Sequence, residues 1–204
     1  MKVLDVKSLV IPDIKVISYH HFADDRGFFT ETFRESDLTK VIPNFQIKQV
    51  NESFSKKGVL RGLHFQWNPY MAKLIRAISG KIIDFFLDIR LGSPTFGKIS
   101  GYELSSQPTA GKNEWILIPV GFAHGILILE DSTIEYLCTS EYSPGCEAGI
   151  SPLSQDIDWS IADKNVKKKL EELKKSQLII SEKDKEGLTL KQWQKDERSK
   201  NFQY

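Results

Sequence analysis

The chain has 204 residues, a length typical of one domain with a substantial core. Its 28 lysines and arginines nearly balance its 27 aspartates and glutamates, leaving a formal net charge of +1. A strong positive field is needed to recruit nucleic acid or an anionic membrane, so the composition excludes both as expected partners. Two cysteines are too few for a disulfide framework, and proline and glycine interrupt the most apolar stretch. We therefore expect a soluble, cytoplasmic protein.

Strand signals dominate the chain between residues 46 and 142. Before them, Ser36 is predicted to cap a short helix that ends at Pro43. Short β-branched and aromatic segments then follow one another, separated by Gly, Pro, Ser and Asn, with no helical period between them. This spacing excludes a doubly wound α/β fold and favours an all-β antiparallel jelly roll with short flanking helices. The predicted strands cover residues 45–54, 59–66, 73–78, 81–90, 97–105, 114–119, 124–130 and 133–142.

A carboxyl-terminal helix is predicted over residues 164–175, where apolar side chains recur at helical spacing. Its lysines alternate with glutamates, which indicates a solvated face rather than a nucleic-acid site. The charged tail over residues 192–204 is predicted to be mobile or to pack against a partner subunit. We treat residues 1–204 as one domain, with a core over about 12–160 and this helix and tail over 161–204. The apolar face of the predicted helix consists of Val166, Leu170 and Leu173.

The strand over residues 73–78 carries a cation on each of its faces. The Ser79-Gly80 pair that follows it predicts a hairpin with residues 81–90. Because alternate side chains share a face, Lys73 and Arg76 point in opposite directions and one of these faces enters the barrel. At least one cation is therefore sequestered, which is a feature of functional sites. The alternative is that Lys73 extends its ammonium to water at the barrel mouth.

Polar side chains also recur on one face of two other predicted strands. A lone histidine is more often a hydrogen-bonded core residue than a catalytic one, but His64 follows an arginine closely in RGLHFQ. A bulge at Gly62 would let Arg61 and His64 address one cavity, whereas without it they lie on opposite faces. The residues expected to line the common lumen are Gln49, Asn51, His64 and Gln66.

PVGFAH matches the Pro-x-Gly-x-x-His pattern of the second metal motif of cupins, which raises the question of a metal site. The first motif of metal cupins supplies two histidines one residue apart and a later glutamate. Here the corresponding stretch, LHFQWNPYMAKL, has one histidine and no acid. Two histidines without a third ligand make a poor catalytic metal site, so we expect no metal.

Seven motifs occur in chain order: DDRGFFTETF, QVNESFSKKGVLRGLHFQ, AKLIRAISGKIIDFFLDIR, GSPTFG, WILIPVGFAHGI, EYLCTSEYSP and SEKD. Together they resemble the dTDP-4-dehydrorhamnose 3,5-epimerase family, from about Pro12 to Trp159 and again over residues 178–184. The resemblance implies a cofactor-independent cupin jelly roll, usually a homodimer. It also implies a nucleotide-linked 4-keto-6-deoxy sugar as substrate.

The resemblance assigns catalytic roles to four residues. A ketone at C4 acidifies the hydrogens on C3 and C5, so inversion needs a base, a stabiliser for the enolate oxygen and a proton donor on the opposite face. His64 matches the base, and Asp184 matches the carboxylate that orients its ring. Lys73 matches the cation near the enolate oxygen, and Tyr136 matches the residue that returns a proton. Without the resemblance, Asp184 reads as a surface acid and Tyr136 equally well as a core aromatic.

The resemblance also maps substrate contacts onto nine further residues. Arginine suits a diphosphate because its forked donors can engage two oxygens at once. The mapped residues are Arg26, Phe28, Glu31, Gln49, Asn51, Arg61, His124, Glu147 and Lys183.

Three departures from the family pattern bear on these assignments. ISPLSQD stands where the family carries a Trp-Asn-Asp sequence, which alters the expected base or sugar pocket. Leu137 replaces a more usual lysine, and the predicted helix lengthens the connection to SEKD, which could separate Asp184 from His64. The expected activity is inversion at C3 and C5 of dTDP-4-keto-6-deoxyglucose. The alternatives are a single-centre epimerase or ketoisomerase on another nucleotide sugar, and a non-catalytic sugar-binding cupin.

Overall fold

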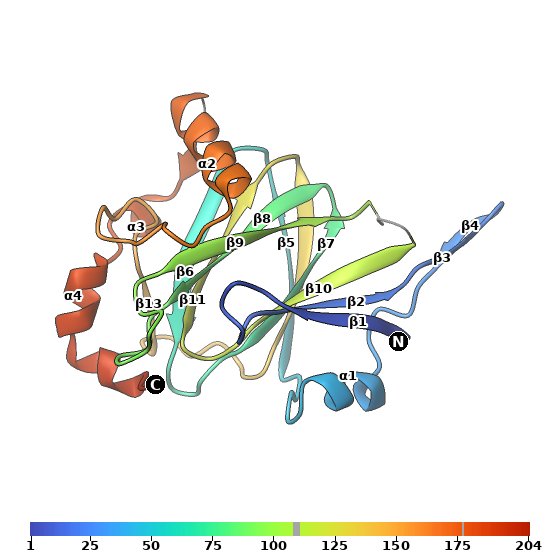
Figure 1. Cartoon of the computed structure of the whole chain (residues 1–204), viewed down its shortest axis with the longest axis horizontal. Helices are drawn as coiled ribbons and strands as arrows, with labels where there is room; N and C mark the ends of the chain where they lie inside the picture. Colours follow the sequence, from blue (N-terminus) through green and yellow to red (C-terminus); the bar gives the residue numbers. More distant parts are fainter. Residues whose placement is uncertain (108–110, 177) are drawn as a thin grey trace.

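Two antiparallel β-sheets lie face to face in the computed structural model, which describes residues 1–107, 111–176 and 178–204 (Figure 1). Each of the strands predicted from the sequence overlaps one of β5 to β12, and the predicted all-β jelly roll is confirmed. The first sheet runs in the order β1 (Val3–Ser8), β2 (Lys15–His20), β10 (Lys112–Ile118), β7 (Lys73–Ser79), β12 (Ser132–Cys138) and β5 (Gln49–Ser55). The second runs β13 (Glu147–Gly149), β6 (Val59–Gln66), β11 (Phe122–Ile128), β8 (Lys81–Asp88) and β9 (Ile99–Ser105), with β14 (Ile179–Ile180) paired to β6.

The hairpin predicted at Ser79-Gly80 is wrong. Strand β7 lies between β10 and β12 in the first sheet, whereas β8 lies between β9 and β11 in the second. The turn therefore carries the chain from one sheet to the other. Gly80 has a φ of +76°, and a Cβ there would lie 2.3 Å from Ser132 Oγ, so this tight corner requires glycine. A local turn signal marks the corner, but tertiary packing decides which strands pair.

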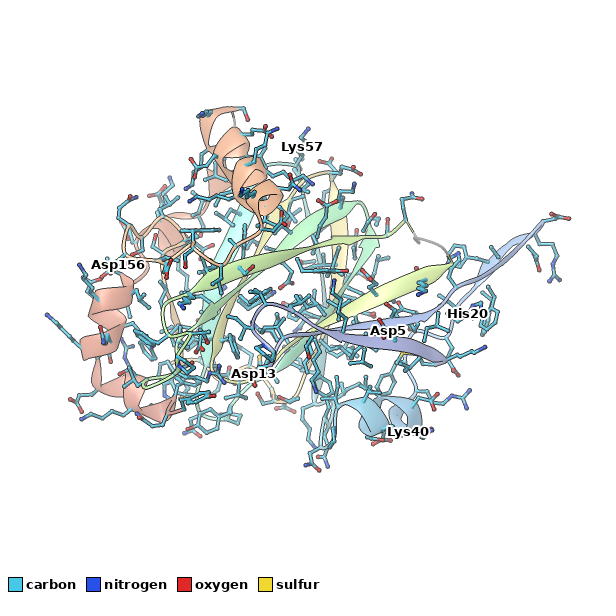
Figure 2. The ribbon with its side chains drawn as sticks, in the orientation of Figure 1. Asp5, Asp13, His20, Lys40, Lys57 and Asp156 are labelled. Atoms are coloured by element: carbon cyan, nitrogen blue, oxygen red, sulfur yellow. The ribbon has the colours of Figure 1, made fainter. Side chains whose placement is uncertain are left out.

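Because side chains alternate between the two faces of each strand, apolar residues form two separate regions, one between the sheets and one on the outer face of the second sheet. Residues such as Ile75, Phe86 and Ile126 point inward and fill one end of the space between the sheets. Leu63 and Phe65 point to the outer face of the second sheet, where they pack under the carboxyl-terminal elements. Figure 2 shows side chains filling the interior between the sheets. The other end of the lumen is left to polar side chains, and it holds the candidate site.

Four short elements cover the outer face of the second sheet: α2 (Lys164–Ser176), α3 (Glu182–Lys185), α4 (Leu190–Lys195) and the 3₁₀ helix η1 (Glu197–Asn201). Val166 and Leu170 of α2 are buried, as predicted. The tail is packed on its own chain rather than mobile, because Trp193 and Phe202 are buried in the core. The prediction relied on the many charged residues of the tail, and average composition does not show which side chains face inward.

The amino-terminal part of the chain adds a helix and a projecting hairpin. Helix α1 (Glu35–Val41) packs on the outer face of the first sheet and ends before Pro43, as predicted. The predicted cap is wrong, since Arg34 holds the N-cap position without a side-chain hydrogen bond and Ser36 lies within the first turn. The hairpin of β3 (Phe22–Asp24) and β4 (Gly27–Phe29) projects away from the two sheets (Figure 1). Within the described ranges, every helix is too short or too polar to cross a membrane.

Candidate active site

A polar pocket of 240 Å³ opens at the end of the lumen between the two sheets. A larger groove of 720 Å³ runs between α2 and β9, but its lining contains none of the residues expected to carry the chemistry. We therefore place the candidate site in the smaller pocket. Its lining consists of Gln49, Asn51, His64, Phe65, Gln66, Met71, Lys73, Tyr136, Cys138, Tyr142 and Glu147.

A β-bulge at Gly62 sets the direction of His64. Along β6 and β11, His124 pairs with His64 whereas Ile126 pairs with Arg61, so one extra residue is accommodated on β6. Gly62 has a φ of +116°, and a Cβ there would lie 2.5 Å from the Cα of Gly125. The predicted bulge is thus confirmed. It sends Arg61 across to the first sheet, where its Nε donates to a serine hydroxyl of β5 at 2.9 Å.

Asp184 is held against His64 by the edge of the same sheet. Strand β14 pairs in parallel with β6, so the chain returns from α2 directly beside the strand that carries His64. Ser181 then caps α3 by accepting a hydrogen bond from the backbone N–H of Asp184. The result is a distance of 2.7 Å between His64 Nε2 and Asp184 Oδ1. The longer connection therefore does not separate the two residues.

The electrostatics of this pair favour one tautomer of His64. Burial alone would raise the pKa of Asp184, but hydrogen bonds from His64, from the Gly62 N–H and from Ser181 hold it below its usual value. An ionised carboxylate only accepts hydrogen bonds, so His64 Nε2 carries the proton that it donates to Asp184. In the neutral imidazole, the other ring nitrogen, Nδ1, is then the one that can accept a proton. The His64 side chain remains about one-third exposed, whereas that of Asp184 is buried.

Lys73 and Tyr136 face His64 from the first sheet. Burial lowers the pKa of Lys73, and the acidic groups of Cys138, Asp84 and Glu147 oppose that shift. Burial also raises the pKa of Tyr136, with Cys138 adding to the effect, so the phenol holds its proton at neutral pH. Of the two cations on this strand, Lys73 lines the pocket, whereas Arg76 pairs with Glu135 on the other face. The pocket combines an oriented imidazole on one wall with an ammonium and a neutral phenol on the other.

Hydrogen bonds hold the polar residues of β5 in fixed positions. Gln49 Nε2 donates to Asn51 Oδ1 at 2.9 Å, and Gln49 Oε1 accepts from the Tyr142 N–H at 2.8 Å. At the rim, the ammonium of Lys183 and the hydroxyl of Tyr142 both lie 2.9 Å from Glu147 Oε1. These contacts bring four of the predicted substrate-contacting residues to the pocket or its mouth.

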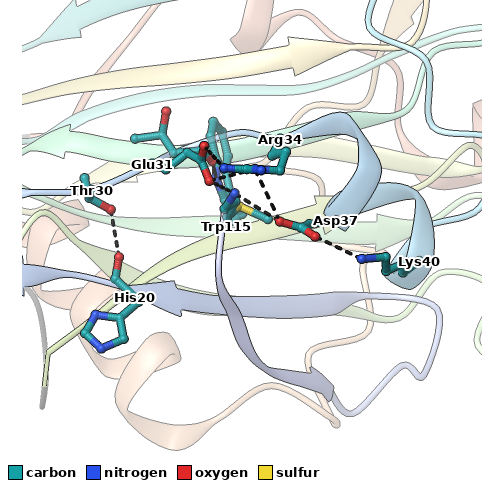
Figure 3. Close-up of polar contacts among 9 residues, drawn as sticks. His20, Thr30, Glu31, Arg34, Asp37, Lys40 and Trp115 are labelled. Carbon is teal, nitrogen blue, oxygen red and sulfur yellow. Dashed lines mark hydrogen bonds and ion pairs between the residues drawn. The ribbon is translucent and has the colours of Figure 1, made fainter.

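Three predicted site residues lie on the amino-terminal elements, away from the pocket of this chain, whose lining also lacks Arg61. Arg26 and Phe28 belong to the projecting β3–β4 hairpin, where both are exposed. Glu31 forms an ion pair with Arg34 at 2.7 Å and another with the amino group of Met1, beside α1 (Figure 3). One chain alone therefore does not bring these residues to His64.

The structure adds residues that sequence reasoning missed. Asp84 is fully buried and lies 2.9 Å from His124 Nε2, so His124 is held inside the lumen rather than on the lining of the pocket. Asp84 interrupts the apolar run IIDFF, a pattern that would have marked it as an expensive charge to bury. Tyr142 lies at the mouth and is about half exposed. Among the described residues, no group of three or more His, Cys, Asp or Glu side chains is placed to hold a metal ion.

Comparison with known proteins agrees with this architecture. The family model described as dTDP-4-dehydrorhamnose 3,5-epimerase matches residues 8–192. An enzyme of that name from Neisseria gonorrhoeae is 43% identical over 71% of this chain, and the match spans 43% of that protein's own length. Another from Shigella flexneri is 39% identical over 78% of this chain and 88% of the relative.

A solved structure extends the similarity to three dimensions. It is a dTDP-6-deoxy-D-glucose-3,5-epimerase from Legionella pneumophila in complex with dTDP-4-keto-L-rhamnose. Its TM-score is 0.78 at 33% identity, covering 92% of this chain and 93% of that one. Fold and comparisons define a carbohydrate epimerase, an isomerase of the cupin-like jelly-roll class. The chain belongs to the dTDP-4-dehydrorhamnose 3,5-epimerase family.

Proposed function

We propose that the protein inverts C3 and C5 of dTDP-4-keto-6-deoxyglucose to give dTDP-4-keto-L-rhamnose, without a metal or organic cofactor. The observation that carries the proposal is the His64–Asp184 pair, 2.7 Å apart, facing Lys73 and Tyr136 in one pocket. The substrate class follows from the relatives, since the Legionella enzyme holds dTDP-4-keto-L-rhamnose. The pocket supplies the chemistry that such a sugar needs.

Proton removal is assigned to His64. The C4 ketone acidifies the hydrogens at C3 and C5, and an imidazole is a competent base near neutral pH. Asp184 accepts the Nε2 proton, directs Nδ1 toward the sugar and stabilises the imidazolium that forms. As the C–H bond breaks, its electrons move into the enolate, and negative charge develops on O4. The ammonium of Lys73, which lines the same pocket, stabilises that charge.

Proton return is assigned to Tyr136. Inversion requires that the proton arrive on the face opposite to the one from which it left. Tyr136 comes from the first sheet and His64 from the second, so the two groups lie on opposite walls of the pocket. The phenol is protonated before the reaction because burial raises its pKa. After it gives its proton to the enolate carbon, Arg61 stabilises the phenolate by its charge.

A second copy of the chain completes the site in this proposal. Ligand pockets usually measure roughly 300–1,000 Å³, and the 240 Å³ here suits a sugar ring better than an entire nucleotide sugar. The β3–β4 hairpin carries Arg26 with exposed Phe28 and Phe29 away from its own chain (Figure 1). In a symmetric homodimer each hairpin would bury these aromatics against the partner and bring Arg26 to the partner's pocket. Arg26 would there engage the diphosphate.

The proposal is tested by supplying 4-keto-6-deoxyglucose linked to dTDP, UDP, GDP or CDP and identifying the products by NMR. We expect inversion at both carbons with the dTDP sugar. Inversion at one carbon would assign a single-centre epimerase, and movement of the carbonyl would assign a ketoisomerase. Binding without any reaction would assign a sugar-binding protein. Each of the last three outcomes overturns the proposed activity.

A further inference from the structure

A second histidine–aspartate pair lies inside the lumen, on strands β11 and β8. His124 Nε2 is 2.9 Å from Asp84 Oδ2, and Asp84 is completely buried. Its other oxygen, Oδ1, has no hydrogen-bond partner within the described part of the chain. A buried carboxylate is costly unless it is fully bonded, so an uncommitted oxygen at this position calls for a function.

A comparison on the same strand sharpens this point. Asp88 is also completely buried, but Arg90, Ser93 and Thr95 all donate hydrogen bonds to its carboxylate. That arrangement is typical of a structural buried acid. Asp84 differs because one of its two carboxyl oxygens has no hydrogen-bond partner among the described residues.

The cation that Asp84 can serve is Lys73. Asp84 shares its face of β8 with Ile82 and Phe86, and Lys73 shares its face of β7 with Ile75, so both point into the space between the sheets. The groups that act electrostatically on the Lys73 ammonium are Cys138, Asp84, Glu147 and His124. Burial raises the pKa of the Cys138 thiol and lowers that of His124, so both are neutral at pH 7. Glu147 is committed to an ion pair and a hydrogen bond at the rim. Among these groups, Asp84 is the buried carboxyl group with an oxygen that no other described residue uses.

We propose that Asp84 is a positioning residue that acts through Lys73, keeping its ammonium protonated and held at the place where the enolate oxygen forms. His124 holds the carboxylate in place through Oδ2, which leaves Oδ1 for Lys73. The role of Lys73 at the enolate rests on the proposed function. The effect of Asp84 on the charge of Lys73 does not, since it belongs to the protein without substrate.

The first test is therefore made without substrate. Lysines are reductively methylated with ¹³C-formaldehyde, the Lys73 signal is assigned by its loss in Lys73→Arg, and its titration is followed by NMR. In Asp84→Asn, which keeps the shape and a hydrogen-bond acceptor for His124 but removes the charge, we expect the acid dissociation constant of Lys73 to rise at least tenfold. Asp88→Asn is the matched control and should leave the Lys73 titration unchanged. An unchanged titration in Asp84→Asn overturns the proposal.

The second test is a double-mutant cycle on the reaction itself. Asp84→Asn should lower kcat at least tenfold while changing KM less than threefold. In a Lys73→Met background the same change should cost less than twofold in deuterium incorporation, because its target is gone. An equal loss in both backgrounds would overturn the proposal. If Asn is not tolerated, Asp84→Ser removes the same charge with a smaller side chain and gives the same two readouts.

The two tests separate this inference from the proposed function. A wild-type protein without epimerase activity whose Lys73 titration depends on Asp84 would refute the proposed function alone. An active protein in which the Lys73 titration does not change in Asp84→Asn would refute the inference alone.

Discussion

His64 Nε2 lies 2.7 Å from Asp184 Oδ1, although 120 residues separate the two in the chain. The contact depends on the parallel pairing of β14 with β6, which anchors the end of a long excursion through α2 beside the strand of His64. Sheet pairing and the Ser181 cap, rather than proximity in sequence, therefore fix the position of Asp184 relative to the proposed base, His64.

Replacing Asp184 with Asn should reduce turnover by about 10²–10⁴-fold, the range that a general base contributes. An amide can donate to Nε2, so it no longer fixes the tautomer in which Nδ1 is the base. Glu182→Gln is the matched control, because Glu182 lies on the same short helix but pairs with Lys185 at the surface. Steady-state kinetics of both variants checks this. Comparable losses in the two would indicate a general disturbance of α3 instead.

Replacing Gly62 with Ala should destabilise the fold and disturb His64. A positive φ costs a non-glycine residue roughly 1–2 kcal/mol, and overpacking adds about 1–3 kcal/mol. Gly92→Ala is the control, since Gly92 also has a positive φ but a Cβ there meets nothing within 4 Å. Urea denaturation should show a clearly larger loss for Gly62→Ala. Equal losses would mean that the bulge is not tightly packed against β11.

Acid should weaken the fold partly through Asp88. Burial would raise the pKa of Asp88, but hydrogen bonds from Arg90, Ser93 and Thr95 hold it below the ordinary 3.8. A depressed pKa means that the unfolded chain takes up the proton first. Its stabilising contribution is therefore complete above about pH 4 and is lost as the pH falls through the folded-state pKa.

The Asp88→Asn variant isolates this contribution. It should lower the free energy of unfolding by about 3 kcal/mol at pH 7, since it leaves the partners of a buried charge unpaired. The difference from the wild type should shrink as the pH is lowered from 4 toward 2. Denaturation curves collected across that range provide the check, and a difference independent of pH would show that Asp88 is not the responsible group.

Mixing two inactive variants should restore activity if the hairpin acts on its partner. An Arg26→Ala chain has an intact pocket but cannot supply Arg26 to its partner. A His64→Ala chain can supply Arg26 to its partner but has no base in its own pocket. Statistical exchange of subunits gives mixed dimers with one intact site, or about a quarter of all sites. We expect up to that fraction of wild-type turnover after co-refolding. No recovery, with subunit exchange verified by mass spectrometry, would place the hairpin's action within its own chain.

Sequence periodicity predicted the strands well because inward and outward residues alternate clearly in segments such as β7 and β12. It failed at Gly80, where a turn signal cannot tell a hairpin from a crossing between sheets. It also failed in the tail, where Trp193 and Phe202 are buried despite many charged neighbours.

The candidate site was predictable to a different degree for each residue. Alternation predicted that Lys73 or Arg76 enters the barrel, and backbone chemistry suggested the bulge at Gly62, whereas the role of Lys73 came from the family resemblance. Asp184 did not, because only long-range pairing brings it to His64, and it was identified by family resemblance. Arg26 lies outside the pocket of its own chain, on the β3–β4 hairpin, and no pattern within one sequence reports the role at a partner's pocket that we propose for it.

The most direct test of the account is the incorporation of solvent deuterium at C3 and C5 of the dTDP-4-keto sugar by wild type, His64→Ala and Tyr136→Phe, followed by NMR. Wild type should label both carbons. His64→Ala should label neither, and Tyr136→Phe should keep part of the exchange while net inversion slows. Exchange by His64→Ala within tenfold of the wild-type rate would contradict the assignment of His64 as the single base.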